Sequence, residues 1–470
     1  MFIASLAALC VALLLFVWAG LRARRPGEDL DDYLVARDSQ GALATGLSFL
    51  ASGMGGWILF APPEVAAFVG PLALAGYAIG AALPFLVFAL FGAAIRRRLP
   101  MGRSVGEFAQ ARFGAGMRRW VSALSVLYML CFLTAELTAI GAITGLLSGV
   151  PGGVAVVGVA VATLVYTAWG GLRASIRTDL WQGWLVLALV ALVGVGAWRW
   201  APPLDAGRAL AQVPVADALG VALTLVIAVT AANLFHQGYW QRLWAARDPR
   251  ALGAGALIGG AATVVVVAAI GALGLLAIAA GIDPGSPPMP LFALLAQAPP
   301  WVALAALVLA VTLVASSVDT LQSGIVSLVV TERRGLSLPA ARRITVALTV
   351  PVVLVALQGY SVLRLFLIAD LLCATTVAPL LLGLWHRVGP KAALAGALAG
   401  LAGAVLPGAI SGGSLAAGVL AASFPGSIPT LAPFAGALLA SSVVSVAIAL
   451  WPARGPRGPL GAAPGGPASG

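Results

Sequence analysis

Long apolar runs with almost no charge constrain this chain more than any other feature. They follow one another from residue 2 to residue 451 with only short polar connections. Each run approaches the roughly 20 apolar residues that a helix needs to cross a bilayer. The 470 residues are 61% hydrophobic and 9% charged, with a mean hydropathy of +1.03. This composition excludes a water-soluble globular chain, and the continuous runs exclude a transmembrane β-barrel, whose strands alternate polar and apolar residues.

Thirteen membrane spans are predicted, which makes the protein all-α with no sizeable soluble domain. They cover about residues 2–20, 42–69, 71–95, 118–148, 152–169, 179–197, 216–236, 252–281, 300–330, 344–358, 362–385, 391–410 and 430–451. Residues 1–451 therefore form one transmembrane domain. The segment 452–470 is rich in Gly, Pro and Ala, and it is predicted to be a disordered tail because it offers too little apolar surface to fold.

The basic residues indicate the topology. The formal net charge is +11, and the 27 Lys and Arg residues lie in small clusters between the apolar runs. When the thirteen spans alternate across the bilayer, all but Arg199, Arg208 and Arg364 fall on one side. Basic residues are enriched in cytoplasmic loops, so the N-terminus is predicted outside and the C-terminus in the cytoplasm of a cell inner (plasma) membrane protein. We expect no nucleic-acid partner, and the acidic stretch 28–38 is predicted to be a solvated loop.

Residues for enzyme chemistry are scarce. Cys10, Cys131 and Cys373 all lie inside apolar runs and lack a CxxC pairing, so they are expected to be buried small side chains. His236 and His386 are placed at cytoplasmic helix ends, outside any nucleophile or metal constellation. The sequence therefore predicts a protein that is not an enzyme.

Five acidic residues lie in or at the edges of apolar runs, where ionisable groups are costly and commonly functional: Glu64, Glu136, Asp179, Asp319 and Asp370. Glu64 is near the outer end of its span and is expected to reach the interface. Asp179 either caps the start of a helix or has a function. Glu136 is the best functional candidate, because it lies in the middle of a long helix where its side chain cannot reach water.

One predicted helix carries a polar stripe. The stripe consists of Thr312, Ser316, Asp319 or Thr320, Ser323 and Ser327. They recur every three or four residues along an otherwise apolar segment, which places them on one face. Such a stripe either hydrogen-bonds to neighbouring helices or lines a pathway with an ion site, since a hard cation needs several oxygen ligands.

Glycines interrupt the second apolar run. Gly53, Gly55 and Gly56 crowd its middle, and each weakens a helix by about 1 kcal/mol relative to Ala. They indicate either close helix packing or a break, and unwound backbone at membrane depth is tolerated where it lines a cavity. A transporter with repeated halves would have a matching break, and residues 231–238 end a helix in a polar, Gly-containing sequence.

Several motifs occur in a family's order from residue 31 to about residue 385. They are Asp31-Asp-Tyr-Leu-Val-Ala-Arg37, Ala51-Ser-Gly-Met-Gly-Gly-Trp57, Tyr166-Thr-Ala-Trp-Gly-Gly-Leu-Arg-Ala-Ser-Ile-Arg-Thr-Asp-Leu-Trp-Gln182, the pair Gln241-Arg242, and Ala315-Ser-Ser-Val-Asp319. With them the chain resembles the sodium/solute symporters, which include the proline and sodium/glucose transporters. The resemblance implies a leucine-transporter-like fold with a 5+5 inverted repeat and broken first and sixth core helices. The extra N-terminal helix is then 1–21, the ten-helix core 42–385, and the two C-terminal helices 391–451.

The resemblance also implies a sodium ion between the first and eighth core helices. Its ligands would be backbone carbonyls near Ala51, Met54 and Leu313 and the hydroxyls of Ser316 and Ser317. Asp179 matches an acidic residue that the family links to sodium release toward the cytoplasm. Na⁺ is therefore the expected coupling ion.

The implied substrate site lies beside the sodium ion at mid-membrane. It would be formed by Ser52, Gly53, Gly55, Gly56, Trp57, Phe132, Glu136, Thr230 and Asn233. Gly53 stands where proline-transporting relatives have an aspartate, so the resemblance does not carry proline specificity. The role of Glu136 stays open between binding a cationic or polar substrate and taking a proton.

The sequence thus predicts a secondary active symporter that imports a small polar solute with the sodium gradient by alternating access. The alternatives are proton coupling in the same fold, through Glu136 or Asp319, and a membrane solute sensor that signals through a separate partner chain. The identity of the solute and the oligomeric state are not predicted.

Overall fold

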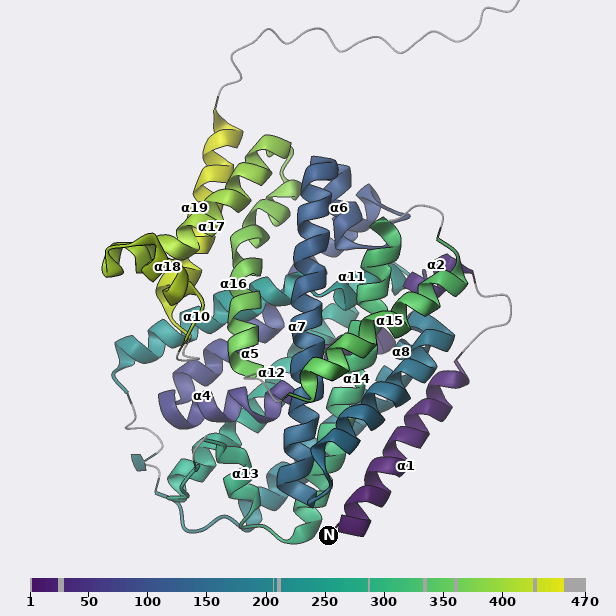
Figure 1. The fold of residues 1–470 in the computed structure, drawn as a ribbon, viewed down its shortest axis with the longest axis vertical. Coiled ribbons are helices and arrows are strands. Elements are labelled where there is room, and N and C mark those ends of the chain that lie inside the picture. Colours follow the sequence, from purple (N-terminus) through teal and green to yellow (C-terminus); the bar gives the residue numbers. More distant parts are fainter. Residues whose placement is uncertain are drawn as a thin grey trace, which may run out of the picture.

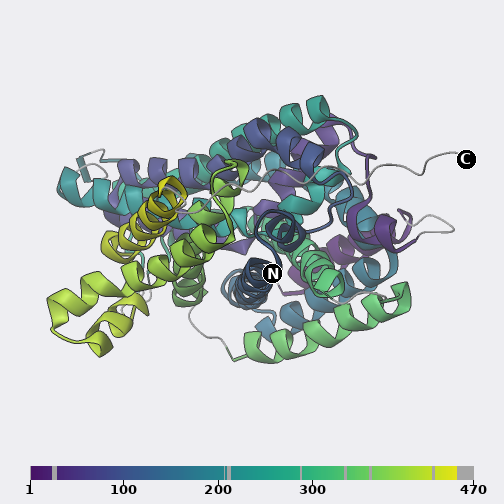
Figure 2. The same ribbon diagram turned by 90° about the horizontal axis from the view of Figure 1, so that it is seen from above.

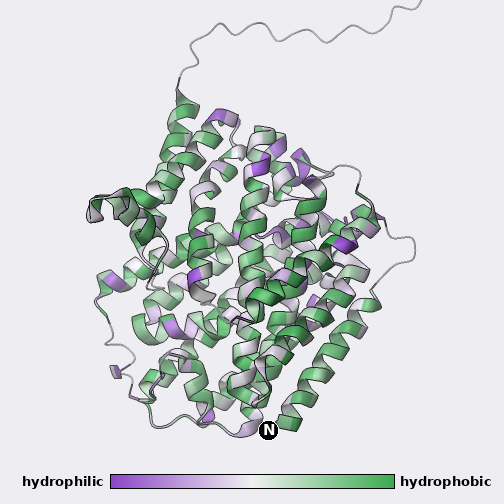
Figure 3. Ribbon diagram, in the orientation of Figure 1, coloured by the Kyte–Doolittle hydropathy of each residue, from purple (hydrophilic) through white to green (hydrophobic). Residues whose placement is uncertain are grey.

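The computed structural model describes residues 2–23, 29–205, 207–208, 213–285, 288–332, 336–358, 362–425 and 429–451. Within these ranges the protein is a bundle of helices, most of them long enough to cross a bilayer (Figure 1). The expected tail, 452–470, lies outside the described residues. Apolar residues dominate the outer helix surfaces, as a lipid-facing bundle requires (Figure 3).

Eleven helices among the described residues are long and apolar enough to span a membrane. They are α1 (Phe2–Leu21), α5 (Pro71–Arg98), α7 (Ala115–Ser148), α8 (Gly152–Arg199), α10 (Val215–Leu234), α12 (Pro249–Ala279), α14 (Pro300–Glu332), α15 (Leu338–Ala356), α16 (Val362–Leu381), α17 (Pro390–Gly412) and α19 (Leu431–Leu450). The bent pair of α3 (Ala42–Gly53) with η1 (Gly56–Leu59) and α4 (Ala61–Val69) adds a twelfth span.

The helix α8 accounts for two of the predicted spans. It has 48 residues, about 72 Å at 1.5 Å per residue, which is more than twice the hydrocarbon thickness of a bilayer. Gly171 interrupts it with a φ of +54°, and a Cβ there would lie 2.4 Å from the Tyr33 carbonyl oxygen. Only glycine suits this positive φ and close approach, so the two spans meet at Gly171. Counted this way, the described chain has the thirteen spans that the sequence predicts.

The expectation of a solvated acidic loop at 28–38 is wrong for its described part. Residues Leu30–Val35 form the helix α2, which Asp29 caps by accepting a hydrogen bond from the Asp32 backbone N–H. Tyr33, Leu34 and Val35 are buried, so the segment contributes to the core. The acidic residues of α2 are paired with arginines from other parts of the chain. Asp31 pairs with Arg37 and Arg103, and Asp32 pairs with Arg173.

The helix α14 is the most enclosed span, and it organises the centre of the bundle. It packs against α7 and α8, and its middle also contacts α3. On the other side α3 packs against α12, which in turn packs against α5. The helix α1 lies along the outside of α8, and α17 and α19 pair at one edge of the bundle (Figures 1 and 2). The polar residues of α14 are therefore turned into the protein and away from lipid.

Short helices close one end of the bundle. They are α6 (Val105–Phe113), α11 (Gln237–Ala245) and α2, which lie near the same end in Figure 1. The Gln237 amide donates to the Arg103 carbonyl at 2.7 Å, and the Gln241 amide donates to the Leu34 carbonyl at 2.6 Å. These bonds tie all three elements together. Two further short helices, α13 (Pro290–Leu295) and α18 (Leu415–Ala422), lie elsewhere on the bundle.

Candidate functional site

The first break is at the glycines that the sequence singles out. The helix α3 ends at Gly53, Met54 has an extended backbone, and the chain continues as η1 and α4 after a bend of 64°. The carbonyl oxygens in the last turn of a helix have no hydrogen-bond partner within that helix. The same holds for the N–H groups in the first turn of the next helix. The break therefore presents acceptors on one side, including the Ala51 carbonyl, and donors on the other.

The second break is between α10 and α11, as the sequence predicts. Two residues that do not belong to either helix, Phe235 and His236, separate them. The placement of His236 at a cytoplasmic helix end is wrong, because the side chain is completely buried at this break. Its ring lies 5.7 Å from that of Phe132 and 4.6 Å from that of Tyr239, and both ring nitrogens lack a hydrogen-bond partner.

Glu136 extends from α7 into the first break. One carboxylate oxygen, Oε2, accepts a hydrogen bond from the Gly56 N–H at 2.6 Å, while the other, Oε1, is buried without a partner. The contact is so close that a Cβ at Gly55 would lie 2.1 Å from Oε1. The glycine at 55 therefore makes room for the carboxylate, and Glu136 occupies the donor side of the break.

Three of the residues predicted as sodium ligands lie in one turn of α14 beside the first break. The α14 turn that contains Leu313, Ser316 and Ser317 runs beside the break, since Val314 in the same turn would contact a Cβ placed on Gly56. The Ser316 hydroxyl donates to Asp179 Oδ1 at 2.7 Å. The Ser317 hydroxyl is buried and has no hydrogen-bond partner.

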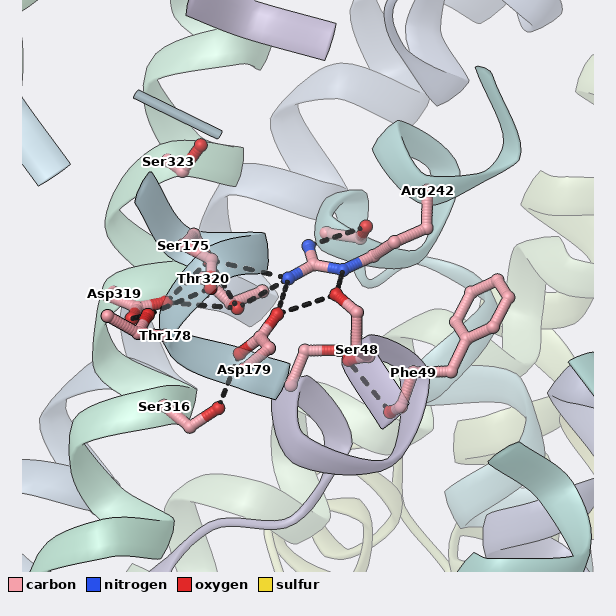
Figure 4. Close-up of polar contacts among 12 residues, drawn as sticks. Ser48, Phe49, Ser175, Thr178, Asp179, Arg242, Ser316, Asp319, Thr320 and Ser323 are labelled. Carbon is pink, nitrogen blue, oxygen red and sulfur yellow. Dashed lines mark hydrogen bonds and ion pairs between the residues drawn. The ribbon is translucent and has the colours of Figure 1, made fainter. Parts of the chain in front are cut away.

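Asp179 is in the middle of a helical segment, so it does not cap a helix. Its carboxylate pairs with the guanidinium of Arg242 from α11 at 2.7 Å, and both side chains are at most 1% exposed. The Ser48 hydroxyl donates to the same carboxylate at 2.6 Å, and Arg242 also donates to Ser48 at 2.9 Å and to the Thr320 hydroxyl at 3.0 Å. Figure 4 shows how this network joins α3, α8, α11 and α14.

Asp319 lies beside this network with a separate set of donors. The hydroxyls of Tyr166 and Ser175 each donate to its carboxylate at 2.6 Å, and Thr178 donates at 3.1 Å. The polar stripe of α14 thus hydrogen-bonds to α8 around Asp319, as the interhelical alternative predicts. An ion site along the stripe stays a prediction.

The remaining predicted substrate residues lie on α3, η1, α7 and α10. The Trp57 ring stacks on that of Tyr77 at 5.5 Å, and Phe132 lies one helical turn from Glu136. A Cβ at Gly53 would lie 2.1 Å from the Tyr239 hydroxyl, so Tyr239 fills the space that a side chain would need. Three polar groups bond within the protein: Ser52 donates to the Ser48 carbonyl, Thr230 to the Gly80 carbonyl and Asn233 to the Val229 carbonyl.

Three site residues lack a predicted role. Arg242 belongs to the quoted Gln241-Arg242 motif, yet nothing in the sequence pairs it with a carboxylate 63 residues away. Tyr239 and Tyr77 are single tyrosines at helix positions that a sequence treats as core. The sequence contained one signal for the role of Arg242. An Arg close to a membrane span is rare and, if it is buried, needs an acidic partner.

Known proteins resemble the chain in sequence. A model of the Sodium:solute symporter family matches residues 33–199. The spermidine transporter DUR31 of Candida albicans (strain SC5314 / ATCC MYA-2876) is 30% identical over 392 residues, which cover 81% of this chain and 75% of that protein.

Solved structures resemble the chain in fold. A Na⁺-coupled sialic acid symporter in a substrate-bound outward-open state has a TM-score of 0.72 at 17% identity, covering 94% of this chain and 98% of that chain. Mhp1, a nucleobase-cation-symport-1 family transporter, has a TM-score of 0.56 at 14% identity, covering 91% and 96%. At these identities the likeness shows the fold, which is that of the leucine transporter.

The order of the motifs, the two broken helices and the extent of the sequence match agree with one another. They make the protein a multi-pass membrane transporter of solutes and not an enzyme. The chain belongs to the sodium:solute symporter family.

Proposed function

We propose that the protein is a secondary active symporter that uses the sodium gradient to import a small polar solute by alternating access. The observation that carries the proposal is the Ser317 hydroxyl, which is buried without a partner in the α14 turn beside the first break. A buried hydroxyl without a hydrogen bond is costly, and a cation bound to its oxygen would remove that cost. Carbonyl and hydroxyl oxygens are the ligands that a hard cation prefers.

The sodium site would combine three backbone carbonyls with two hydroxyls. The carbonyls are those of Ala51, Met54 and Leu313, and the hydroxyls are those of Ser316 and Ser317. The substrate would bind next to the ion, against the break and the neighbouring faces of α7 and α10. Because the ion and the solute share the break, each would favour the conformation that the other binds.

The Asp179–Arg242 network would govern the opening toward the cytoplasm. It ties α3, α8, α11 and α14 together next to Ser316, at the end that α2 and α6 also close. Rearrangement of this network would release Ser316 and give the ion a path past Asp179. The excess of basic residues at this end supports its assignment to the cytoplasm, with the N-terminus outside and the C-terminus inside.

Proton coupling in the same fold is a second candidate, favoured by one observation. Glu136 has a buried oxygen without a partner, and protonation of the carboxylate would remove the cost of an uncompensated charge. Asp319 is less suited to this role, because three hydroxyls already donate to its ionised form.

Sodium binding can be tested without knowing the solute. We expect Na⁺ to raise the unfolding temperature of the purified protein relative to K⁺ at equal ionic strength, because a ligand that binds the folded state stabilises it. Ser317→Ala should abolish most of this shift with little change in K⁺. The matched control is Ser441→Ala in α19, a buried serine whose hydroxyl bonds within its own helix. Equal unfolding temperatures in Na⁺ and K⁺ would contradict a sodium site.

Uptake assays need a first solute. The Candida relative is named a spermidine transporter, so spermidine is the compound with which to begin. Moving one positive charge inward gains about 2.3 kcal/mol per 100 mV of membrane potential, so sodium-coupled uptake should also respond to voltage.

A further inference from the structure

The donor side of the first break is already occupied by the protein. N–H groups at the start of a helix carry partial positive charge and favour an anion, and transporters with broken helices use them to hold anionic groups of substrates. Here the Gly56 N–H donates to Glu136 Oε2 at 2.6 Å, and the same carboxylate lies so close to Gly55 that a Cβ there would be 2.1 Å from Oε1. A solute carboxylate would therefore meet donors that are taken and a charge of its own sign.

Glu136 is one of three carboxylates in this region that have no cationic partner. The others are Asp370 in α16, which is buried, and Glu64 in the first turn of α4, which is half-buried. Among the described residues none of the three is in an ion pair, and the buried Arg242 is engaged by Asp179. A cation that entered this part of the bundle would meet three carboxylates without a cationic partner.

Aromatic rings surround the same carboxylates. Trp57 stacks on Tyr77 at 5.5 Å, and Phe132 of α7 meets Phe366 of α16 edge to face at 5.0 Å. The faces of such rings attract cations, and a desolvated cation–π contact contributes about 2 kcal/mol. A proton would need no aromatic surroundings, so this composition favours an organic cation over a proton as the group that neutralises the carboxylates.

His236 supplies an independent sign that a polar ligand binds here. It is completely buried, and both ring nitrogens lack hydrogen-bond partners although its ring contacts Phe132. A neutral imidazole nitrogen can accept a hydrogen bond from an ammonium group. A solute with N–H donors lying against Phe132 would satisfy a histidine that the protein leaves unpaired.

The carboxylates are spaced along α7. Trp120 of α7 donates to Thr376 of α16, and Phe132 meets Phe366, so the two helices are antiparallel. Asp370 lies between these contacts, level with the α7 turn that ends at Cys131. Glu136 is five residues beyond Cys131, which is about 7.5 Å along the axis at 1.5 Å per residue. Phe132 lies between the two levels, so one aliphatic chain could lie against its ring with an ammonium group near each carboxylate.

We infer that the transported solute is an organic cation without a carboxylate, an aliphatic amine held by Glu136 and Asp370 against the ring of Phe132. The inference rests on the proposed function, since it concerns the substrate site of that symporter. Glu136 then determines specificity: it fills the anion site of the break and converts it into a cation site. Amino acids and other carboxylates are excluded by the same side chain.

Solute binding to the purified full-length protein in Na⁺ tests this inference. The probes are spermidine, putrescine and choline as organic cations, proline as a zwitterion, urea as a neutral solute and lactate as an anion. We expect unfolding temperatures to rise with organic cations, most with the diamine or polyamine, and not with proline, urea or lactate. Glu136→Gln and Asp370→Asn should each weaken binding of the best cation about tenfold to hundredfold, because each removes a charged hydrogen-bond partner.

Two controls separate this inference from the proposed function. Stabilisation by Na⁺ alone should persist in Glu136→Gln, which shows a folded protein with an intact ion site. Asp205→Asn removes an exposed acidic residue in a loop and should leave cation binding unchanged.

Several results would overturn the inference while sodium stabilisation persists. The first is a larger rise in unfolding temperature with proline, urea or lactate than with the cations. The second is an unfolding temperature that no cation changes, and the third is an unchanged cation affinity in Glu136→Gln. Unchanged cation uptake in Glu136→Gln with a lost pH dependence would instead make Glu136 a proton carrier. Loss of the sodium shift in the wild-type protein would contradict the proposed function itself.

Discussion

Asp179 and Glu136 are both completely buried carboxylates in the membrane interior, yet the protein treats them in opposite ways. Asp179 has an arginine at 2.7 Å and hydroxyl donors from two further helices. Glu136 has a backbone N–H on one oxygen and nothing on the other. A fully paired buried charge holds helices in one arrangement. An incompletely paired buried carboxylate is stabilised when a positively charged group binds beside it. We therefore assign the first to the structure of the closed end, and we propose that the second binds the ligand.

The largest effect is expected from breaking the paired carboxylate. Arg242→Met leaves Asp179 buried without its cation and should lower the free energy of unfolding by about 3–5 kcal/mol. Unfolding in denaturant, followed by tryptophan fluorescence in detergent, measures the change. The double variant with Asp179→Asn should recover most of the loss, because it removes the orphaned charge. A single variant as stable as the wild type would mean that the pair contributes little.

A smaller effect is expected from crowding the unpaired carboxylate. Gly55→Ala places a Cβ 2.1 Å from the present position of Glu136 Oε1. The carboxylate or the break must shift, and overpacking of this kind costs about 1–3 kcal/mol. Cation affinity should fall as well, because Glu136 moves. Gly145→Ala is the matched control, since a Cβ there meets no atom within 4 Å. Wild-type stability and cation affinity in Gly55→Ala would show that the carboxylate is free to lie elsewhere.

Removing the charge of the unpaired carboxylate should hardly change stability. Glu136→Gln keeps an oxygen for the Gly56 N–H and removes a charge that lacks a cation, so we expect the free energy of unfolding to change by about 1 kcal/mol or less. Asp179→Asn alone should be more harmful, since Arg242 loses its counter-ion. The contrast between the two isosteric changes sharpens the comparison. Equal losses in both variants would remove the distinction between the two carboxylates.

The smallest effect is expected at the surface of the same end. Burial raises the pKa of Asp31, but hydrogen bonds and charges from Arg37 and Arg103 outweigh it and hold the pKa below the usual 3.8. The stability from this cluster is therefore present above the unfolded pKa and is lost as the pH falls through the lower folded value. Asp31→Asn should cost about 0.2–1 kcal/mol at neutral pH and less in acid. A loss that grows as the pH falls below 3.8 would contradict this sign.

Much of the architecture could be predicted because lipid restricts what a chain can do. The spans follow from the lengths of the apolar runs. The first break follows from Gly53, Gly55 and Gly56, because three glycines close together destabilise a continuous helix. The sequence also places a connection between the spans 152–169 and 179–197, and Gly171 lies within that connection. These features depend on residues close together in the sequence.

Contacts between distant residues could not be predicted in the same way. The pairing of Asp179 with Arg242, the burial of His236 between aromatic rings and the folding of α2 onto α8 each depend on how helices pack. The sequence cannot choose between a helix cap and a function for Asp179, because the partner of Asp179 lies on another helix. Hydropathy places His236 at a helix end, and only the packing of α7 against the second break shows that this end lies inside the protein.

Uptake into proteoliposomes containing only this protein tests the central claim most directly. Labelled spermidine is the solute, the external solution contains Na⁺ or K⁺ at equal ionic strength, and a set ion gradient fixes the membrane potential. We expect uptake to require an inward sodium gradient, to accelerate as the interior becomes more negative and to be lost in both Ser317→Ala and Glu136→Gln. Equal uptake in Na⁺ and K⁺, or full uptake by Glu136→Gln, would contradict this claim.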